Sequence, residues 1–246
     1  MEWSTEIPRE IYAKLYVPWR RVRVEVSIIS RLLKKNNARK VIEFGCGVGR
    51  HGYLLSKEGF EILLTDVRDW RIGMARKLPF KYYDILRGGF IDLFEGGYSM
   101  ATMILFDREK MIKALRNIWE NLRIGGVFIF DYNFSTYEEP EKVDVRFDGE
   151  IYSALLRKSI YRKIDGGFFY EYRVEVVNSR GELVGVEDAS YPIYGKEEIF
   201  RILDKTDFEI DEVVWASWDP RKYMYKILSS EDDADSMFIS AKKRNR

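Results

Sequence analysis

Three glycines at alternate positions, Gly45, Gly47 and Gly49, form the part of the chain best suited to binding a nucleotide-like ligand. Residues rich in β-forming types precede them, and a segment that favours a helix follows from His51. Glycine tolerates positive φ and lets a ligand approach the backbone, while the first turn of a helix offers free N–H groups to polar or anionic atoms. Residues 41–52 therefore predict a strand, a glycine-rich turn and a helix start.

An acidic residue at the end of the next predicted strand favours a ligand site over an ordinary tight turn. Residues 61–66 read Glu-Ile-Leu-Leu-Thr-Asp and end in Asp66. Read from Gly47, the glycines match the dinucleotide fingerprint Gly-x-Gly-x-x-Gly, with Asp66 near the spacing expected for a ribose contact. Read from Glu43, they form Glu-x-Gly-x-Gly-x-Gly. The dinucleotide register fits less well, because its first glycine lies beyond the predicted end of the strand.

The elements that must position these residues alternate between strands and helices. Two amphipathic helices, interrupted at Pro18, are predicted within residues 8–35. Strands are predicted at 41–44, 62–65, 81–86, 102–106 and 127–130, and helices at 51–57, 68–77 and 109–122. This alternation is typical of an open α/β sheet whose ligand lies at the carboxyl ends of the strands.

The pattern changes from about residue 148. Three segments alternate β-forming and polar residues and are separated by glycine-containing turns: 151–162, 167–178 and 182–194. They predict an antiparallel three-stranded meander. A helix at 196–206 and strands at 209–218 and 236–242 follow it.

Together these pieces resemble the class I S-adenosylmethionine-dependent methyltransferases, and their layout is similar to that of the small-molecule, glycine N-methyltransferase-like enzymes. The matching parts are residues 43–49, Asp66, Met74 and Ala75, Asp84, and residues 122–131, with Ile124 where the family usually has proline. The resemblance implies an α/β fold, a Rossmann-like doubly wound and mostly parallel seven-stranded sheet with an inserted antiparallel three-stranded meander. It also implies one methyltransferase domain over residues 1–246, with an N-terminal helical cap at 1–36 and a lid subdomain at 148–195.

The same resemblance implies how the cofactor S-adenosylmethionine would be bound. Asp66, beside Val67, would accept hydrogen bonds from both ribose hydroxyls. Asp84 and Ile85 would face the adenine. The methionine part would be surrounded by Glu43 and the turn that contains Gly45, Cys46, Gly47 and Gly49. Arg20 would pair with the methionine carboxylate, with Arg21 and Arg23 as competing choices.

Four further residues stand where the family places groups that orient or deprotonate the methyl acceptor: Tyr16, Asp107, Tyr132 and Asn133. The implied reaction moves a methyl group to a nitrogen or oxygen of a small molecule by in-line displacement at the sulfonium, leaving S-adenosylhomocysteine. Much of the rate of such a reaction can come from positioning and water exclusion. His51 is interpreted as a helix-start residue and not as a base.

Composition narrows the other possibilities. Lysine plus arginine total 41 against 40 acidic residues, so a net charge of +1 provides no global field for nucleic acid or membrane. Cys46 is the only cysteine and His51 the only histidine, which argues against a metal cluster. We expect no membrane partner, a cytoplasmic location, and a homodimer as an option. A charged fraction of 33% and the absence of glutamine favour a thermophilic source.

Three alternatives stay open. The first is an RNA (tRNA or rRNA) methyltransferase, although only residues 20–23 and the C-terminal tail cluster basic residues, so a nucleic-acid partner is not favoured. The second is a non-catalytic module that binds S-adenosylmethionine. The third, less favoured still, is a dehydrogenase.

Overall fold

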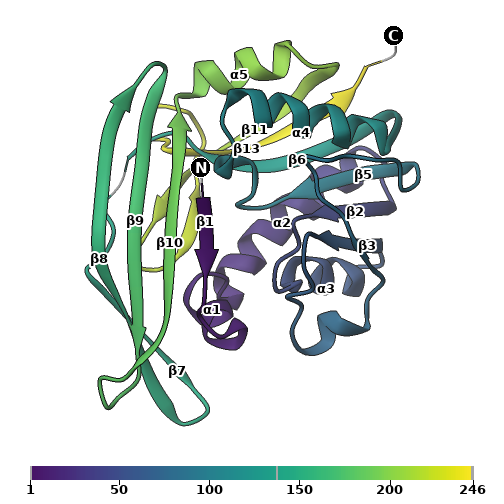
Figure 1. Cartoon of the computed structure of the whole chain (residues 1–246). Helices are drawn as coiled ribbons and strands as arrows, with labels where there is room; N and C mark the ends of the chain where they lie inside the picture. Colours follow the sequence, from purple (N-terminus) through teal and green to yellow (C-terminus); the bar gives the residue numbers. More distant parts are fainter. Residues whose placement is uncertain (1, 137, 245–246) are drawn as a thin grey trace.

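The computed structural model describes residues 2–136 and 138–244, which form two β-sheets (Figure 1). In spatial order, the larger sheet consists of β12 (Met224–Ile227), β11 (Phe208–Asp219), β13 (Ser236–Lys243), β6 (Leu122–Asn133), β5 (Phe94–Ser99), β2 (Lys40–Phe44), β3 (Glu61–Asp66) and β4 (Phe80–Tyr82). From β4 to β6 all neighbours pair in parallel, whereas β13, β11 and β12 pair antiparallel.

The predicted α/β class is confirmed, but the predicted seven-stranded sheet is corrected. Among the described residues the sheet is mixed and has eight strands. The additional strand is β12, which extends the edge by pairing with the end of β11, from Ala216↔Ile227 to Asp219↔Met224. Four residues are too few for an alternating pattern to stand out, so this strand depends on its partner.

Helices cover both faces of the larger sheet. On one face, α2 (Trp19–Lys35) and α3 (Arg50–Lys57) pack with Val41 of β2 in a buried cluster. On the other face, α4 (Arg108–Glu120) and α5 (Lys196–Asp204) pack with Ile42. Adjacent residues of one strand thus face opposite layers, as the pleat of a strand requires, and the sheet is doubly wound.

Several predicted boundaries in the middle of the chain are wrong. The strand expected at 102–106 is instead a short 3-10 helix, η2 (Met103–Leu105), and the true strand is β5. Gly96 and Gly97, although glycine is common in turns, lie inside β5, where a Cβ on Gly96 would come within 2.5 Å of Leu33 on α2. Glycine is therefore needed for helix and sheet to approach closely. The helix expected at 68–77 is reduced to the 3-10 helix η1 (Gly73–Lys77).

The second sheet is larger than the predicted meander. Its strands, in spatial order, are β1 (Glu2–Thr5), β10 (Leu183–Tyr194), β9 (Gly167–Val177), β8 (Glu150–Ile164) and β7 (Lys142–Phe147), all antiparallel. The three expected strands are present as β8, β9 and β10. The sheet differs from the prediction because β1 and β7 extend it at its two edges. Val143 and Val145 of β7 pack with Ile11 of the helix α1 (Arg9–Leu15), which buries their side of the strand.

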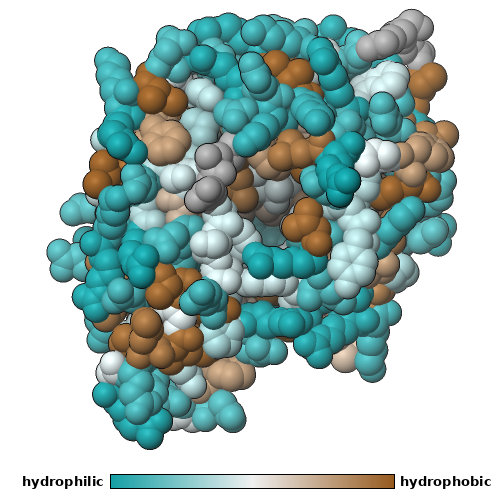
Figure 2. All heavy atoms as spheres, viewed as in Figure 1, coloured by the Kyte–Doolittle hydropathy of each residue, from teal (hydrophilic) through white to brown (hydrophobic). Residues whose placement is uncertain are grey.

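The N-terminal segment therefore connects the two sheets. Its first strand, β1, belongs to the second sheet, while α2 packs on the first (Figure 1). Residues 1–36, predicted as a helical cap, thus contain a strand as well as two helices, and Met1, Asn245 and Arg246 lie outside the described residues. No helix in the described parts of the chain is long and apolar enough to span a membrane. Figure 2 shows a mostly hydrophilic surface on the face that it presents.

Candidate functional site

A cavity of about 460 Å³ lies between the carboxyl ends of the parallel strands and the inner face of the second sheet. The turns after β2, β3, β4 and β5 line one part of it. Strands β8, β9 and β10 and the N-terminal segment line the other. Open α/β sheets bind ligands at these strand ends, so the cavity is the candidate site.

The glycine-rich turn opens onto this cavity. Gly45, Cys46 and Gly47 line it, and Gly47 has φ +49° with no heavy atom within 4 Å of the point where a Cβ would stand. Cys46 is buried at 5% exposure. Gly49 does not line the cavity but begins α3 at φ +75°, where a Cβ would come within 2.8 Å of Ala75. The turn thus combines a backbone open to a ligand with a tightly packed helix start.

Asp66 lies beside this turn, at the end of β3. Its Oδ2 accepts a hydrogen bond from the Gly47 N–H at 2.8 Å. Burial raises the pKa of this carboxyl, while the hydrogen bond from Gly47 opposes that effect. Val67, which follows, also lines the cavity and is 62% exposed, so it stands at the solvent side.

Asp84 and Ile85 line the cavity after β4. The backbone N–H of Leu86 donates to Asp84 Oδ1 at 2.8 Å, and Asn117 Nδ2 donates to the Ile85 carbonyl at 2.7 Å. Both contacts fix the loop. The predicted strand at 81–86 ends early because Asp84 caps this turn.

Glu43 lines the cavity from within the core. It is 1% exposed, and its Oε2 accepts hydrogen bonds from Gly52 N–H at 3.1 Å and Tyr98 OH at 2.9 Å. Burial raises its pKa to about 7. His51 lies next to it, with Nδ1 at 3.8 Å from Glu43 Oε1 and Nε2 at 2.6 Å from Glu25 Oε2. His51 thus lies in the first turn of α3, as predicted, and also belongs to a buried group of ionisable side chains with Glu25 and Glu43.

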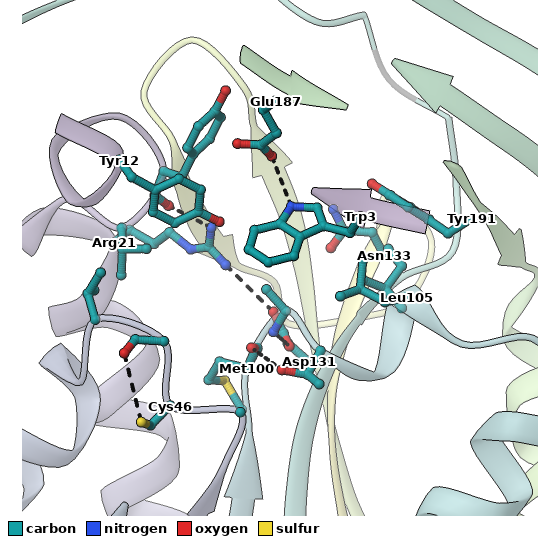
Figure 3. A pocket seen from close by; sticks show the side chains of 18 of the residues that line it. Trp3, Tyr12, Arg21, Cys46, Met100, Leu105, Asp131, Asn133, Glu187 and Tyr191 are labelled. Carbon is teal, nitrogen blue, oxygen red and sulfur yellow. Dashed lines mark hydrogen bonds and ion pairs between the residues drawn. The ribbon is translucent and has the colours of Figure 1, made fainter. Parts of the chain in front are cut away.

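Arg20 does not reach the cavity, which corrects its predicted position. Its side chain is exposed, and Nε donates to the Lys222 carbonyl. Arg21 lines the cavity instead (Figure 3), pairing with Glu25 at 2.7 Å and with Asp131 at 3.8 Å. The sequence signal that could have pointed to Arg21 is its i,i+4 spacing from Glu25, which favours an ion pair on a helix. Glu25 lies on the buried face of α2.

The four residues predicted for the acceptor side have different positions. Tyr16, Tyr132 and Asn133 line the cavity. The Tyr16 hydroxyl is buried without a hydrogen-bond partner among the described residues, and Asn133 Oδ1 accepts a hydrogen bond from Tyr225 OH at 3.1 Å. Asp107 is outside the cavity lining and caps α4 by accepting the Lys110 N–H at 2.9 Å. The structure thus shows a capping contact for Asp107, and its acceptor role stays a prediction.

Sequence reasoning missed much of the cavity wall. The second sheet and the N-terminal and C-terminal segments contribute aromatic and acidic side chains that no motif marked: Trp3, Glu187, Tyr191, Trp218, Tyr223 and Tyr225. The available signal was the high aromatic content of 15%. Among the described residues, no group of three or more His, Cys, Asp or Glu side chains is arranged to hold a metal ion.

Solved structures with this architecture include several methyltransferases. An S-adenosylmethionine-dependent methyltransferase from Clostridium acetobutylicum superposes with a TM-score of 0.71 at 17% identity, covering 96% of this chain and 97% of that one. A sugar N-methyltransferase from Streptoalloteichus gives 0.69 at 14%, covering 96% and 92%. An amino pentose methyltransferase from Micromonospora echinaspora, bound to S-adenosylmethionine, gives 0.66 at 15%, covering 95% and 96%.

The chain therefore has the fold of the class I S-adenosylmethionine-dependent methyltransferases, as its sequence predicted. The likeness extends over nearly the whole length of the chain and of these three structures, second sheet included. No protein-family model and no curated protein sequence matches the chain.

Proposed function

We propose that this protein is an S-adenosylmethionine-dependent methyltransferase that acts on a nitrogen or oxygen of a small molecule. The observation that supports this most directly is the juxtaposition of Gly47 and Asp66 at the cavity. An open glycine backbone and a carboxylate, 2.8 Å apart, lie at the strand ends of a methyltransferase fold.

The residues at this end of the cavity fit the cofactor. A Cβ at Gly47 would fill space that is empty of protein atoms, so the turn leaves room for a ligand against its backbone. Asp66 accepts one close hydrogen bond, and a carboxylate has about four acceptor positions, which leaves capacity for a ribose diol. Asp84 and Ile85 would face the adenine, and Glu43 with the turn 45–47 would surround the methionine part.

When bound, S-adenosylmethionine supplies an electrophilic methyl group on a sulfonium. The protein's contribution would be to position the acceptor and to exclude water. Aromatic side chains from both sheets and from the N-terminal segment would provide the water-poor wall, among them Tyr16, Tyr191 and Tyr225. Asn133 and the Tyr16 hydroxyl would orient the nucleophile.

A small acceptor is favoured by the way the cavity is built. Residues of β8, β9 and β10 cover it opposite the strand ends, and we propose that residues 148–195 act as its lid. The cavity volume of about 460 Å³ is within the range of small-molecule sites. An RNA substrate would instead require an accessible basic surface around the site.

Calorimetry with S-adenosylmethionine and S-adenosylhomocysteine tests the cofactor. Transfer of an isotope-labelled methyl group into a metabolite extract, with tRNA as the parallel substrate, tests the acceptor class. We expect cofactor binding and label in small molecules. Label in the tRNA fraction alone would support the RNA alternative, binding without any transfer would support the non-catalytic module, and binding of NADH in place of S-adenosylmethionine would support the dehydrogenase.

A further inference from the structure

Glu187, on β10, places a buried carboxylate in the cavity with one oxygen unused. The residue is 2% exposed and lies across the cavity from Cys46 (Figure 3). Trp3 Nε1 and Tyr172 OH both donate to Oε1, at 3.3 and 2.5 Å. Oε2 is buried and has no hydrogen-bond partner among the described residues. Because an unsatisfied buried acceptor costs free energy, Oε2 calls for a ligand that donates a hydrogen bond.

A second polar atom without a partner lies in the same part of the cavity. The Tyr16 hydroxyl is buried and makes no hydrogen bond to the described residues. Burial raises the pKa of Tyr16, and the charge of Glu187 is the next largest cause, so the two groups are electrostatically coupled. One ligand group with more than one polar hydrogen, or a hydrogen and a lone pair, would satisfy both atoms.

Aromatic rings surround these two atoms. Trp3, Tyr12, Tyr172 and Tyr191 all line the cavity. The ring centroids of Trp3 and Tyr12 are 6.3 Å apart, and those of Tyr172 and Tyr191 are 6.5 Å apart. Aromatic faces attract cations, and several rings around one carboxylate form an environment suited to an ammonium group.

The fixed charges of the cavity also favour a cation. Among the described lining residues, Arg21 is the only lysine or arginine, and Glu25 and Asp131 both pair with it. The lining carboxylate Glu139 further raises the pKa of Glu187, after the larger effect of burial. A carboxylate or phosphate on the acceptor would therefore be repelled in this region, and an alcohol would not offset the negative charge that Glu187 carries when it is ionised.

We propose that the methyl acceptor is an aliphatic amine, bound in its ammonium form by Glu187 Oε2 within the rings of Trp3, Tyr12, Tyr172 and Tyr191, with the Tyr16 hydroxyl as a second polar contact. This inference rests on the proposed function and specifies its substrate class. Glu187 lies on the second sheet, so it gives that sheet a part in recognition as well as in covering the cavity.

The chemistry of transfer is consistent with this assignment. The ammonium must lose one proton, which Glu187 accepts, before its nitrogen has a free lone pair. Burial raises the pKa of Glu187 to about 7, which makes it a better proton acceptor than an exposed carboxylate. The lone pair then forms the new N–C bond while the C–S bond breaks, and the electron pair of that bond stays on sulfur as a neutral thioether.

Ligand-observed NMR with paired probes tests the inference. Cyclohexylamine and benzylamine are compared with cyclohexanol and benzyl alcohol, with and without S-adenosylhomocysteine. We expect the amines to bind about 10- to 100-fold more tightly than the alcohols, the range for a charge-assisted hydrogen bond. Glu187→Gln, which keeps an acceptor for Trp3 and Tyr172, should remove this preference while alcohol binding stays the same.

Asp188→Asn is the matched control, because Asp188 is the next residue of β10, pairs with Arg173 and does not line the cavity. It should leave the preference intact. Equal binding of amines and alcohols, no binding of any amine, or an unchanged preference in Glu187→Gln would overturn the inference. The affinity for S-adenosylhomocysteine is measured separately on the same samples. Loss of cofactor binding with an intact amine preference would overturn the proposed function and leave only an amine-binding site, whereas cofactor binding without an amine preference would overturn this inference alone.

Discussion

The Gly47 N–H donates to Asp66 Oδ2 at 2.8 Å, which joins the glycine-rich turn after β2 to the end of the adjacent strand β3. The same carboxylate lines the cavity. Asp66 therefore both fixes the turn and faces the cavity, so a substitution there should affect the turn and the proposed cofactor binding to different degrees.

Asp66→Ala should weaken S-adenosylmethionine binding by about 2–3 kcal/mol, the upper range for hydrogen bonds to a charged group. Asp66→Asn keeps an acceptor for the Gly47 N–H, so it should preserve the turn and lose less affinity. Calorimetry on both variants checks this order, with circular dichroism to confirm that they fold. Wild-type affinity in Asp66→Ala would refute the assignment of the ribose contact.

Two glycines in the same segment should respond in opposite ways. Gly47→Val places its side chain in empty space at the cavity, so it should abolish cofactor binding while positive φ costs only about 1–2 kcal/mol of stability. Gly52→Ala should unfold the protein more readily, because its Cβ would come within 2.3 Å of Leu64 and 2.8 Å of Glu43. Urea denaturation and calorimetry on each variant separate the two effects. Equal loss of stability in both would contradict the open position of Gly47.

Arg21 and Arg20 provide a second matched pair. Arg21→Ala would remove the arginine cation from two buried carboxylates, leaving Glu25 with His51 alone and Asp131 without a basic partner, which should cost about 3–5 kcal/mol of unfolding free energy. Arg20 is exposed, so Arg20→Ala should change stability by less than about 0.5 kcal/mol. Chemical denaturation measures both. A large loss in Arg20→Ala together with a stable Arg21→Ala would show that the ion-pair assignment is wrong.

The raised pKa of Glu187 predicts how stability varies with pH. Its pKa rises from an ordinary 4.5 to about 7 in the folded chain, so the folded state holds a proton that the unfolded state has already released. The stabilisation is complete below pH 4.5 and is lost as the pH rises through about 7. The pKa of Glu43 is also raised to about 7, so its contribution to stability is lost over the same pH range. Thermal unfolding of Glu187→Gln should therefore show a smaller decline between pH 5 and 8 than the wild type, and an identical pH profile would disprove this.

Asp107 and Asn133, both predicted from sequence for the acceptor side, should now behave differently. Asp107→Ala removes the N-cap of α4 and should cost about 1 kcal/mol of stability with no change in methyl transfer by the folded protein. Asn133→Ala should reduce transfer while leaving cofactor affinity unchanged. Denaturation together with a methyl-transfer assay distinguishes them. Loss of transfer in a fully folded Asp107→Ala variant would restore the original interpretation.

Local patterns in the sequence determined the part of the site nearest the glycine-rich turn. Strand β2, the turn at 45–49 and Asp66 follow one another within 27 residues, from Lys40 to Asp66, and their residue types constrain the backbone directly. In any strand-turn-helix unit, glycines at this spacing allow positive φ and close approach to the backbone, and an acid at the end of the next strand indicates a ligand contact. The α/β class was predictable for the same reason.

Only the tertiary structure decided which residues far apart in the sequence come into contact. Gly96 lies within β5 because it pairs with β2 and β6, and a Cβ there would come within 2.5 Å of Leu33 on α2. Arg21 rather than Arg20 enters the cavity because of the rotation of α2 on the sheet. Trp3 and Glu187 are 184 residues apart, yet they share a hydrogen bond because β1 pairs with β10. No local propensity encodes such a contact, since it depends on which strands become neighbours and in which register. Short-range sequence therefore determined the part of the cavity at the ends of the parallel strands, and the assembly of the second sheet determined the opposite part.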